Sequence, residues 1–338
     1  MIKFVFPGLT ITALVLAGCS SQPTVSSAAQ SKVPILEKVS PPPAAEAPSD
    51  SCSNLDADYA SSPIKPEVVI YGENTLRKFP IGQIDEALKF YFSQKKPEQD
   101  LLLYVHGRAL GNTKIGDFDH EPEESRTDAI PAFSSKYKID ATIMLHWPHR
   151  KLDDTGFPES DAKSSGKALA CVIQRLNSAD FGTGQYPGFR ALITHSMGAL
   201  VLEEALTSTS EDLHGFNAVV VAAAASRPET ASAWLPKIAA NQRFVLINTH
   251  DVVLREVNQR KHFLPLGKCD SDCLRANQPT PSIVYLDITD IAGTPFNVRH
   301  NYFVKGKVAD RIITKILRGE TPPKGSQGAY ENIRIIKD

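Results

Sequence analysis

The sequence lacks the features that mark several large classes of protein. Its 338 residues carry 37 Lys and Arg against 38 Asp and Glu, so it has no excess of positive charge for nucleic acid. No apolar run reaches the roughly 20 residues that a permanent membrane-spanning helix needs. No G-x-G-x-x-G follows its first predicted strand, and no Gly-rich loop ends in Lys-Ser or Lys-Thr, which argues against dinucleotide-binding and P-loop proteins. With 42% hydrophobic and 22% charged residues, the composition is that of an ordinary globular protein.

The first residues, MIKFVFPGLTITALVLAGCSS, have the pattern of an export signal. A Lys precedes an apolar stretch, residues 4–16, that suits a signal peptide and is too short for a permanent anchor. The small residues LAG then precede Cys19, whose thiol can be alkylated by diacylglycerol. The segment resembles a bacterial lipoprotein signal with its lipobox, which implies cleavage before Cys19, acylation of Cys19 and, from Ser20, sorting to the outer membrane of the cell envelope. A secretory signal with a chance Cys and a buried N-terminal strand are the alternatives.

Residues 20–66 are rich in Pro, Ser and Ala and include Pro41-Pro42-Pro43. Such a segment buries too little apolar surface to fold, and its prolines favour extended conformations, so we expect a semi-rigid tether. The sequence therefore predicts a signal peptide (1–18), an acylated Cys with a disordered tether (19–66), a folded domain (67–318) and a C-terminal tail (319–338).

From residue 67 onwards, short apolar runs alternate with amphipathic segments. Predicted strands occupy residues 67–71, 100–105, 141–146, 190–194, 217–222, 243–248 and 282–288. Predicted helices include residues 85–92, 165–176, 197–206 and 229–240. A run such as 101–105, which is apolar at every position, indicates a strand covered on both faces. The alternation predicts an α/β domain with a mostly parallel sheet and helices on both faces.

Ser196 lies at the corner between a predicted strand and a predicted helix, in the segment RALITHSMGA. A sharp turn there exposes the hydroxyl at the sheet edge, and the helix N-terminus behind it favours negative charge. Gly198 is needed because strand and helix crowd each other after the nucleophile. Thr194 replaces the first Gly of the usual G-x-S-x-G pattern. A Ser that merely caps a helix is the alternative to a nucleophile elbow.

A serine nucleophile needs a base and an acid that holds the base. Asp251 follows the apolar strand FVLIN after one intervening strand, and His300 lies in the loop after the last strand, in the order nucleophile, acid, base. Other acids and histidines fit this order less well: Asp287 falls within a strand, Asp290 is too close to the base's own segment, His250 and His262 precede the last strand, and His195 is expected to face away from the nucleophile.

The oxyanion hole is expected at the exit of the strand LLLYV. That strand ends in His106 and Gly107, and the Gly lets backbone N–H groups approach a substrate oxygen; the donors would be the backbone N–H groups of Arg108 and Met197. His106 then has a structural role and orients this loop, with metal ligation as the weaker alternative. No metal site is predicted, because Pro148 breaks any helix that would align the two rings of the H-x-x-H segment 146–149.

With these residues in place, the chain resembles the α/β-hydrolase superfamily, in particular a bacterial branch of uncharacterised hydrolases with VHG, WP and HSMG motifs. The motifs stand here as Val105-His106-Gly107, Trp147-Pro148 and His195-Ser196-Met197-Gly198. The resemblance implies that Ser196 is on the fifth strand, with the acid after the seventh and the base after the eighth. It also implies acyl hydrolysis by Ser196, Asp251 and His300. Only about 20 residues join the sixth and seventh strands, so no large lid domain is expected.

Four cysteines beyond the signal segment can pair in three ways in an oxidising compartment. Cys171 lies on an apolar helix face and can simply be buried there, whereas Cys52 has no assigned partner. Cys269 and Cys273 stand close enough for a local bridge, which we favour because zinc would need two further ligands.

The sequence thus predicts a lipid-anchored serine hydrolase that cleaves carboxylic esters without a cofactor, with a small-molecule or lipid ester as substrate, the membrane as its anchoring partner and no nucleic acid. A catalytically silent scaffold or binding lipoprotein of the same fold is the alternative from another class. Acyl transfer to an alcohol instead of water is a third possibility.

The lipobox makes a direct prediction about processing. Substitution Cys19→Ser removes the thiol, so it should abolish acylation and leave uncleaved precursor or soluble protein in the envelope, as measured by gel mobility and detergent extraction. Normal processing of this variant, with extraction still requiring detergent, would contradict the lipobox interpretation.

Overall fold

The computed structural model of this chain describes residues 52, 54–62, 65–72, 75–94, 100–108, 129–139, 141–148, 153, 156–178, 188–209, 212–293, 300–328 and 331–337. The chain divides into two compact units, residues 1–48 and 49–338, and all described residues belong to the second. Cys19 and Ser20 therefore lie outside the described residues, and the acylation and sorting of this segment stay predictions.

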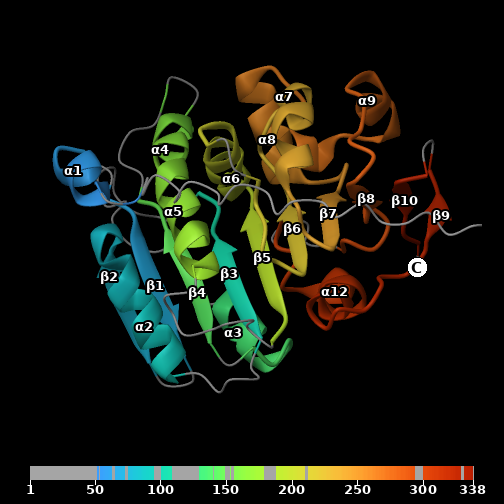
Figure 1. Cartoon of the computed structure of the whole chain (residues 1–338). Coiled ribbons are helices and arrows are strands. Elements are labelled where there is room, and N and C mark those ends of the chain that lie inside the picture. Colours follow the sequence, from blue (N-terminus) through green and yellow to red (C-terminus); the bar gives the residue numbers. More distant parts are fainter. Residues whose placement is uncertain are drawn as a thin grey trace, which may run out of the picture. The chain divides into compact units, whose positions relative to one another are not determined.

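A single sheet of ten strands organises the described part of the chain (Figure 1). In spatial order the strands are β2 (Leu76–Pro80), β1 (Glu67–Tyr71), β4 (Thr142–His146), β3 (Leu101–Val105), β5 (Arg190–His195), β6 (Ala218–Ala222), β7 (Gln242–Ile247), β8 (Val284–Asp287), β10 (Ile333–Ile335) and β9 (Ser326–Gln327). From β4 to β10 all neighbours are parallel, whereas β1 runs antiparallel to both β2 and β4, and β9 is antiparallel to β10.

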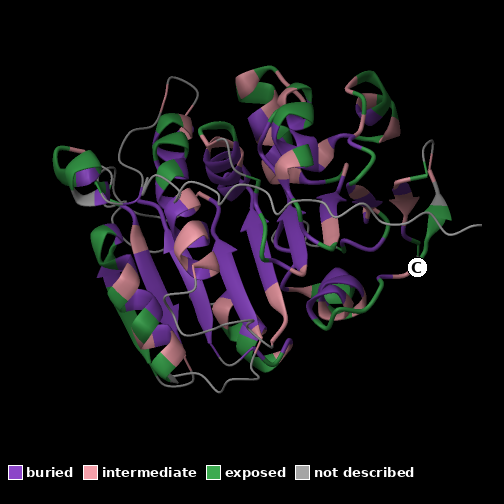
Figure 2. Cartoon of the chain, viewed as in Figure 1, coloured by how far each residue is buried: buried purple, intermediate pink, exposed green. Residues whose placement is uncertain are grey.

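The central strands have the burial that their apolar sequences predict. Every residue of β3, β4 and β6 is buried (Figure 2). Strands buried on both faces require a layer of helices on each side of the sheet. The predicted fold class, an α/β-hydrolase fold with a mostly parallel central sheet, is confirmed.

The helices that cover the sheet are mostly short. They are α1 (Leu55–Ala60), α2 (Ile84–Gln94), α3 (Ile130–Ser135), α4 (Glu159–Ser164), α5 (Gly166–Asn177), α6 (Gly198–Thr207), α7 (Pro228–Trp234), α8 (Val252–Lys261), α9 (Ser271–Ala276), α11 (Gly306–Val308) and α12 (Thr314–Leu317). Helices α2 and α6 both pack against α5. An ion pair of 2.7 Å between Lys136, just after α3, and Asp310 in η6 (Ala309–Ile313) joins α3 to the C-terminal helices.

The boundaries of the domain differ from the sequence prediction at both ends. Before residue 67, α1 buries Leu55 and Tyr59 in the core, so the predicted tether ends earlier than residue 66. After residue 318, β10 pairs in parallel with β8 and β9 pairs with β10, so the predicted tail is part of the sheet. Both segments are short and weakly periodic, and only their packing against the rest of the domain orders them.

Strand β2 was not predicted, because its sequence LRKFP carries no apolar alternation. It forms the sheet edge and exposes all residues but Phe79, so charged side chains are tolerated and protect the edge. Counting β2 makes the serine strand the fifth, with Asp251 after the seventh and His300 after the eighth.

The segment between β6 and β7 holds only α7 and the short helix η4 (Leu235–Lys237). The described residues thus contain no separate lid at the position where this fold often carries one. Within the same residues, no helix combines the length and the hydropathy needed to cross a membrane.

Two disulfides cross-link the described residues. Cys52 pairs with Cys171 on α5 across 119 residues, which ties the segment before the first strand to the helix layer. Cys171 is therefore a cross-linking residue and not merely a buried one. Cys269 pairs with Cys273 at the start of α9, the local bridge that the spacing favours.

Candidate active site

Ser196 occupies the sharp turn between β5 and α6. Its backbone φ of 53° lies in the left-handed region that non-glycine residues rarely adopt. The turn is held in place because the Ser196 N–H donates to the Ala222 carbonyl at 2.9 Å, and the Ser196 carbonyl accepts from the Ala225 N–H at 3.1 Å. Hydrogen bonds to the end of β6 therefore offset the strain at Ser196, which is the geometry expected of a nucleophile elbow.

Two glycines let the elbow lie against the end of β3. A Cβ on Gly198 would lie 2.5 Å from the Val105 carbonyl oxygen, and a Cβ on Gly107 would lie 2.8 Å from the Ser196 Cβ. Neither distance is compatible with a side chain. Gly198 therefore has the packing role that the motif predicts. Gly107 has the same role in the loop after the neighbouring strand β3.

Asp251 and His300 form a buried pair. Asp251 caps α8, and its Oδ1 accepts from the backbone N–H groups of Val253 at 2.9 Å and Leu254 at 3.0 Å. Its Oδ2 accepts from His300 Nδ1 at 2.9 Å. The Asp251 side chain is 0% exposed, so these donors replace water around a fully buried carboxylate. With Nδ1 donating to Asp251, Nε2 is the second hydrogen-bonding atom of the His300 ring.

A cavity brings the pair together with the nucleophile. It holds about 330 Å³ of empty space, part of it open to solvent, and is lined by Arg108, Phe157, His195, Ser196, Met197, Val253, Val257 and His300. Ser196 and His300 therefore face one space, although 104 positions separate them in the chain. Of the other candidates, His195 also lines it, whereas Asp287, Asp290, His250 and His262 do not. Asp287 accepts from the Thr289 N–H, and the other three are exposed.

The loop after β3 is fixed by stacking and hydrogen bonds around His106. The His106 ring stacks on the Trp147 indole with an interplanar angle of 7°, its Nε2 accepts from the Trp147 N–H at 3.1 Å, and its carbonyl accepts from the indole N–H at 2.7 Å. His146 Nδ1 lies 3.1 Å from the same Nε2. His106 thus positions the loop that carries Gly107 and Arg108.

Arg108 and Met197, the expected oxyanion donors, line the same cavity as Ser196. The Arg108 side chain donates to the Gly156 carbonyl at 2.8 Å and stacks over Phe157, with its guanidinium carbon 4.8 Å from the ring centre. Burial lowers the pKa of Arg108 from its usual value. These contacts fix the Arg108 side chain against the segment around Phe157.

His195 does not face away from the site as expected. Its ring centre lies 4.7 Å from that of His300, and its Nε2–H donates to the His300 carbonyl at 3.3 Å. The reason is tertiary, because the segment that starts at His300 folds back over the end of β5. Burial lowers the pKa of His195 well below 6.5, and the nearby His300 ring lowers it further. His195 is therefore a neutral donor that fixes the backbone of His300.

Two positioning residues were not found from the sequence. The Tyr302 hydroxyl accepts from the Ala223 N–H at 2.6 Å and donates to the Leu246 carbonyl at 3.3 Å, so it joins the exits of β6 and β7 to the histidine segment. The Tyr137 hydroxyl donates to the Phe303 carbonyl at 2.5 Å. A Tyr two residues after the candidate base was the only signal of this role in the sequence.

Among the described residues, no group of three His, Cys, Asp or Glu side chains is arranged to hold a metal ion. His149 of the H-x-x-H segment lies outside these residues, and His146 contacts His106 instead.

No protein-family model and no curated protein matches the sequence. Solved structures that resemble the chain include an inhibited esterase B from Lactobacillus rhamnosis, with 13% identity over 74% of this chain and 86% of the esterase and a TM-score of 0.31. Esterase 2 of Thermogutta terrifontis is 12% identical over 75% and 86% of the two chains, with a TM-score of 0.34. Carboxyl esterase 2 of Tuber melanosporum is 10% identical over 82% and 76%, with a TM-score of 0.34. These overall similarities are weak, and the fold rests on the strand order and register of this chain.

The buried His195 predicts a pH dependence of stability. Its pKa is lower in the folded than in the unfolded chain, so the unfolded chain binds an extra proton as the pH falls below about 6.5. His195 should therefore remove about 1.4 kcal/mol from the free energy of unfolding per pH unit below that value, until its folded pKa is reached. Substitution His195→Gln should flatten the profile between pH 5 and 7 in urea titrations. The exposed control His250→Gln should keep the wild-type slope, and an unchanged slope in His195→Gln would contradict the prediction.

Proposed function

We propose that this protein is a serine hydrolase that cleaves carboxylic esters through an acyl-enzyme, with Ser196 as nucleophile, His300 as base and Asp251 as the acid that orients the base. The observation that carries the proposal is the buried Asp251–His300 hydrogen bond, whose histidine opens into the same cavity as a serine held at positive φ. A serine that only caps a helix needs neither the strained turn nor the buried acid–base pair.

The proposed reaction follows from these positions. His300 Nε2 takes the Ser196 hydroxyl proton as Oγ attacks the ester carbonyl carbon, and the carbonyl oxygen becomes an oxyanion. His300 then gives that proton to the leaving alcohol as the C–O bond breaks, and Ser196 keeps the acyl group. A water molecule, deprotonated by His300, attacks the acyl-enzyme, and the acid leaves as Ser196 recovers its proton.

The backbone N–H groups of Met197 and Arg108 are the proposed donors to the oxyanion. In hydrolases a donor of this kind contributes about 2.7–4 kcal/mol to transition-state stabilisation. In this scheme the Asp251 carboxylate accepts two N-cap hydrogen bonds and the His300 N–H, and these three contacts fix the carboxylate and orient the His300 ring.

We also propose that the protein acts from the bacterial cell envelope as a lipoprotein, anchored through acylated Cys19 and sorted to the outer membrane. The lipobox-like LAGC segment supports the anchor. The two disulfides within the described residues suit an oxidising compartment outside the cytoplasm.

Covalent labelling tests the nucleophile and separates an enzyme from a silent scaffold. The wild-type protein should react with a fluorophosphonate probe, whereas Ser196→Ala and His300→Ala should not. On a short-chain nitrophenyl ester, each single substitution should lower kcat by about 10⁶, and the double variant should be hardly worse, because members of a triad act as a unit. Labelling of Ser196→Ala, or multiplicative losses in the double variant, would remove these residues from the reaction.

The choice of acid is tested separately. Asp251→Asn keeps the size of the side chain but loses the charge that orients and stabilises the His300 ring, so kcat should fall by about 10⁴. Asp287→Asn and Asp290→Asn are matched controls on the neighbouring strand and loop and should change kcat much less. If the Asp290→Asn variant were inactive and the Asp251→Asn variant active, the acid would lie one strand later.

A further inference from the structure

A second, larger cavity adjoins the one that holds Ser196. It encloses about 450 Å³ of empty space, part of it open to solvent, between α4, α6, α8 and the start of α7. Phe157, Met197 and Val257 line both cavities, so the two spaces are neighbours across these side chains. Whatever is bonded to Ser196 during the proposed reaction can therefore extend into the second cavity.

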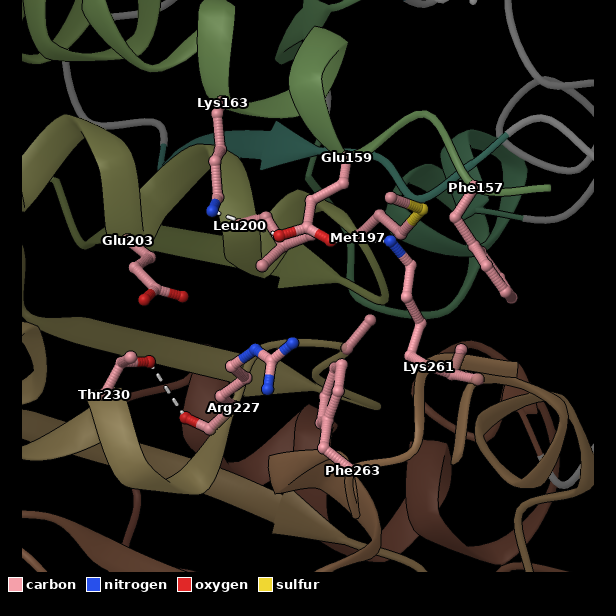
Figure 3. A pocket seen from close by; sticks show the side chains of 12 residues that line it. Phe157, Glu159, Lys163, Met197, Leu200, Glu203, Arg227, Thr230, Lys261 and Phe263 are labelled. Carbon is pink, nitrogen blue, oxygen red and sulfur yellow. Dashed lines mark hydrogen bonds and ion pairs between the residues drawn. The ribbon is translucent and has the colours of Figure 1, made fainter. Parts of the chain in front are cut away.

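Apolar side chains form much of this wall. Met197 and Leu200 come from the elbow and α6, and Phe157 and Phe263 face them from two other segments (Figure 3). Such a lining suits a hydrocarbon portion of a substrate.

The two lysines of the cavity already have partners. Lys163 pairs with Glu159 at 3.1 Å, and Lys261 pairs with Glu159 at 2.7 Å and also with Asp153. Figure 3 shows both ammonium groups turned towards the Glu159 side of the cavity. These charges therefore largely neutralise one another.

Arg227 differs from the lysines. Its backbone is fixed at the start of α7, where the Thr230 hydroxyl donates to the Arg227 carbonyl at 3.0 Å. Its guanidinium carbon lies 4.1 Å from the centre of the Phe263 ring, and the group points into the cavity (Figure 3). No carboxylate within the described part of the chain forms an ion pair with Arg227, so the N–H groups of its guanidinium can donate to a ligand.

Glu203 is the other acidic side chain of this cavity, and no ion pair joins it to Arg227. Burial raises the pKa of Glu203, so it gains its negative charge at a higher pH than an ordinary glutamate. An anion that enters the cavity therefore meets a guanidinium group that forms no ion pair with the described carboxylates.

We propose that the substrate is an ester that carries an anionic group, such as a carboxylate, at the end of an apolar chain, and that Arg227 binds this group. The apolar chain lies along Met197, Leu200 and Phe263. This inference rests on the proposed function, since it assigns the substrate class of the Ser196 site. The anion can belong to the acid or to the alcohol portion of the ester, and the experiment separates the two.

The test compares esters that differ only by a terminal carboxylate. On the acid side, the nitrophenyl monoesters of succinic, adipic and suberic acid are paired with nitrophenyl butyrate, hexanoate and octanoate. On the alcohol side, the acetate ester of hydroxyhexanoic acid is paired with that of hexanol. The readout is the ratio of kcat/KM for the charged ester to that for its neutral counterpart, in low salt.

The wild-type ratio should be about 10 for the ester whose chain length and charged side allow its carboxylate to reach Arg227. Substitution Arg227→Gln should lower this ratio about 10-fold or more, and Arg227→Lys should retain part of the preference. Added salt should reduce the wild-type ratio, because the cavity is open to solvent. Arg255→Gln, which removes an equal charge from an exposed position on α8 outside the cavity, should change the ratio less than about twofold.

A wild-type ratio at or below one on both sides would overturn the proposal, as would equal effects of Arg227→Gln and Arg255→Gln. Either result would leave Arg227 as a side chain that only packs on Phe263. Failure of the proposed function is distinct, because then neutral and charged esters would both resist hydrolysis and the fluorophosphonate probe would not label the wild-type protein.

Discussion

The contact between the β5–α6 turn and the end of β3 is the constraint on which the candidate site depends. Gly198 lets the first turn of α6 lie directly against the Val105 carbonyl, and Gly107 lets the loop after β3 lie against Ser196. This close approach brings the segments that carry Arg108, Ser196 and Met197 together around one cavity. It also keeps Ser196 at positive φ, because the hydrogen bonds to Ala222 and Ala225 prevent the turn from relaxing.

A buried carboxylate imposes the second requirement. Asp251 is fully buried, and the domain satisfies it with the N-terminus of α8 on one oxygen and His300 on the other. Loss of any of these donors would leave a buried charge short of hydrogen bonds, which is costly. The carboxylate therefore fixes the orientation of His300, and Tyr302 and His195 fix its backbone.

The electrostatics of the two cavities follow from how their charges are matched. Glu159 and Asp153 neutralise the lysines near α4 and α8, and Arg108 is held by a carbonyl and an aromatic ring. The Arg227 guanidinium lies over Phe263 and pairs with no carboxylate of the described residues. The cavity beside the serine is thus lined by apolar side chains and by charged groups of both signs. The proposed preference for an anionic substrate rests on Arg227 within this set.

The sequence by itself determined those parts of the protein whose signals are local. Continuous apolar runs predicted seven strands, and the small residues around Ser196 predicted the elbow, because a sharp strand-to-helix turn permits few side chains. The order of Ser196, Asp251 and His300 then followed from counting strands.

Only the tertiary structure decided the rest. Strand β2 is an edge strand without apolar alternation, β10 is ordered by pairing with β8, and the Cys52–Cys171 bridge joins residues far apart in the chain. The contact of His195 with His300 and the open position of Arg227 likewise depend on segments that meet only when the sheet is complete, and no local pattern of residues specifies such a meeting.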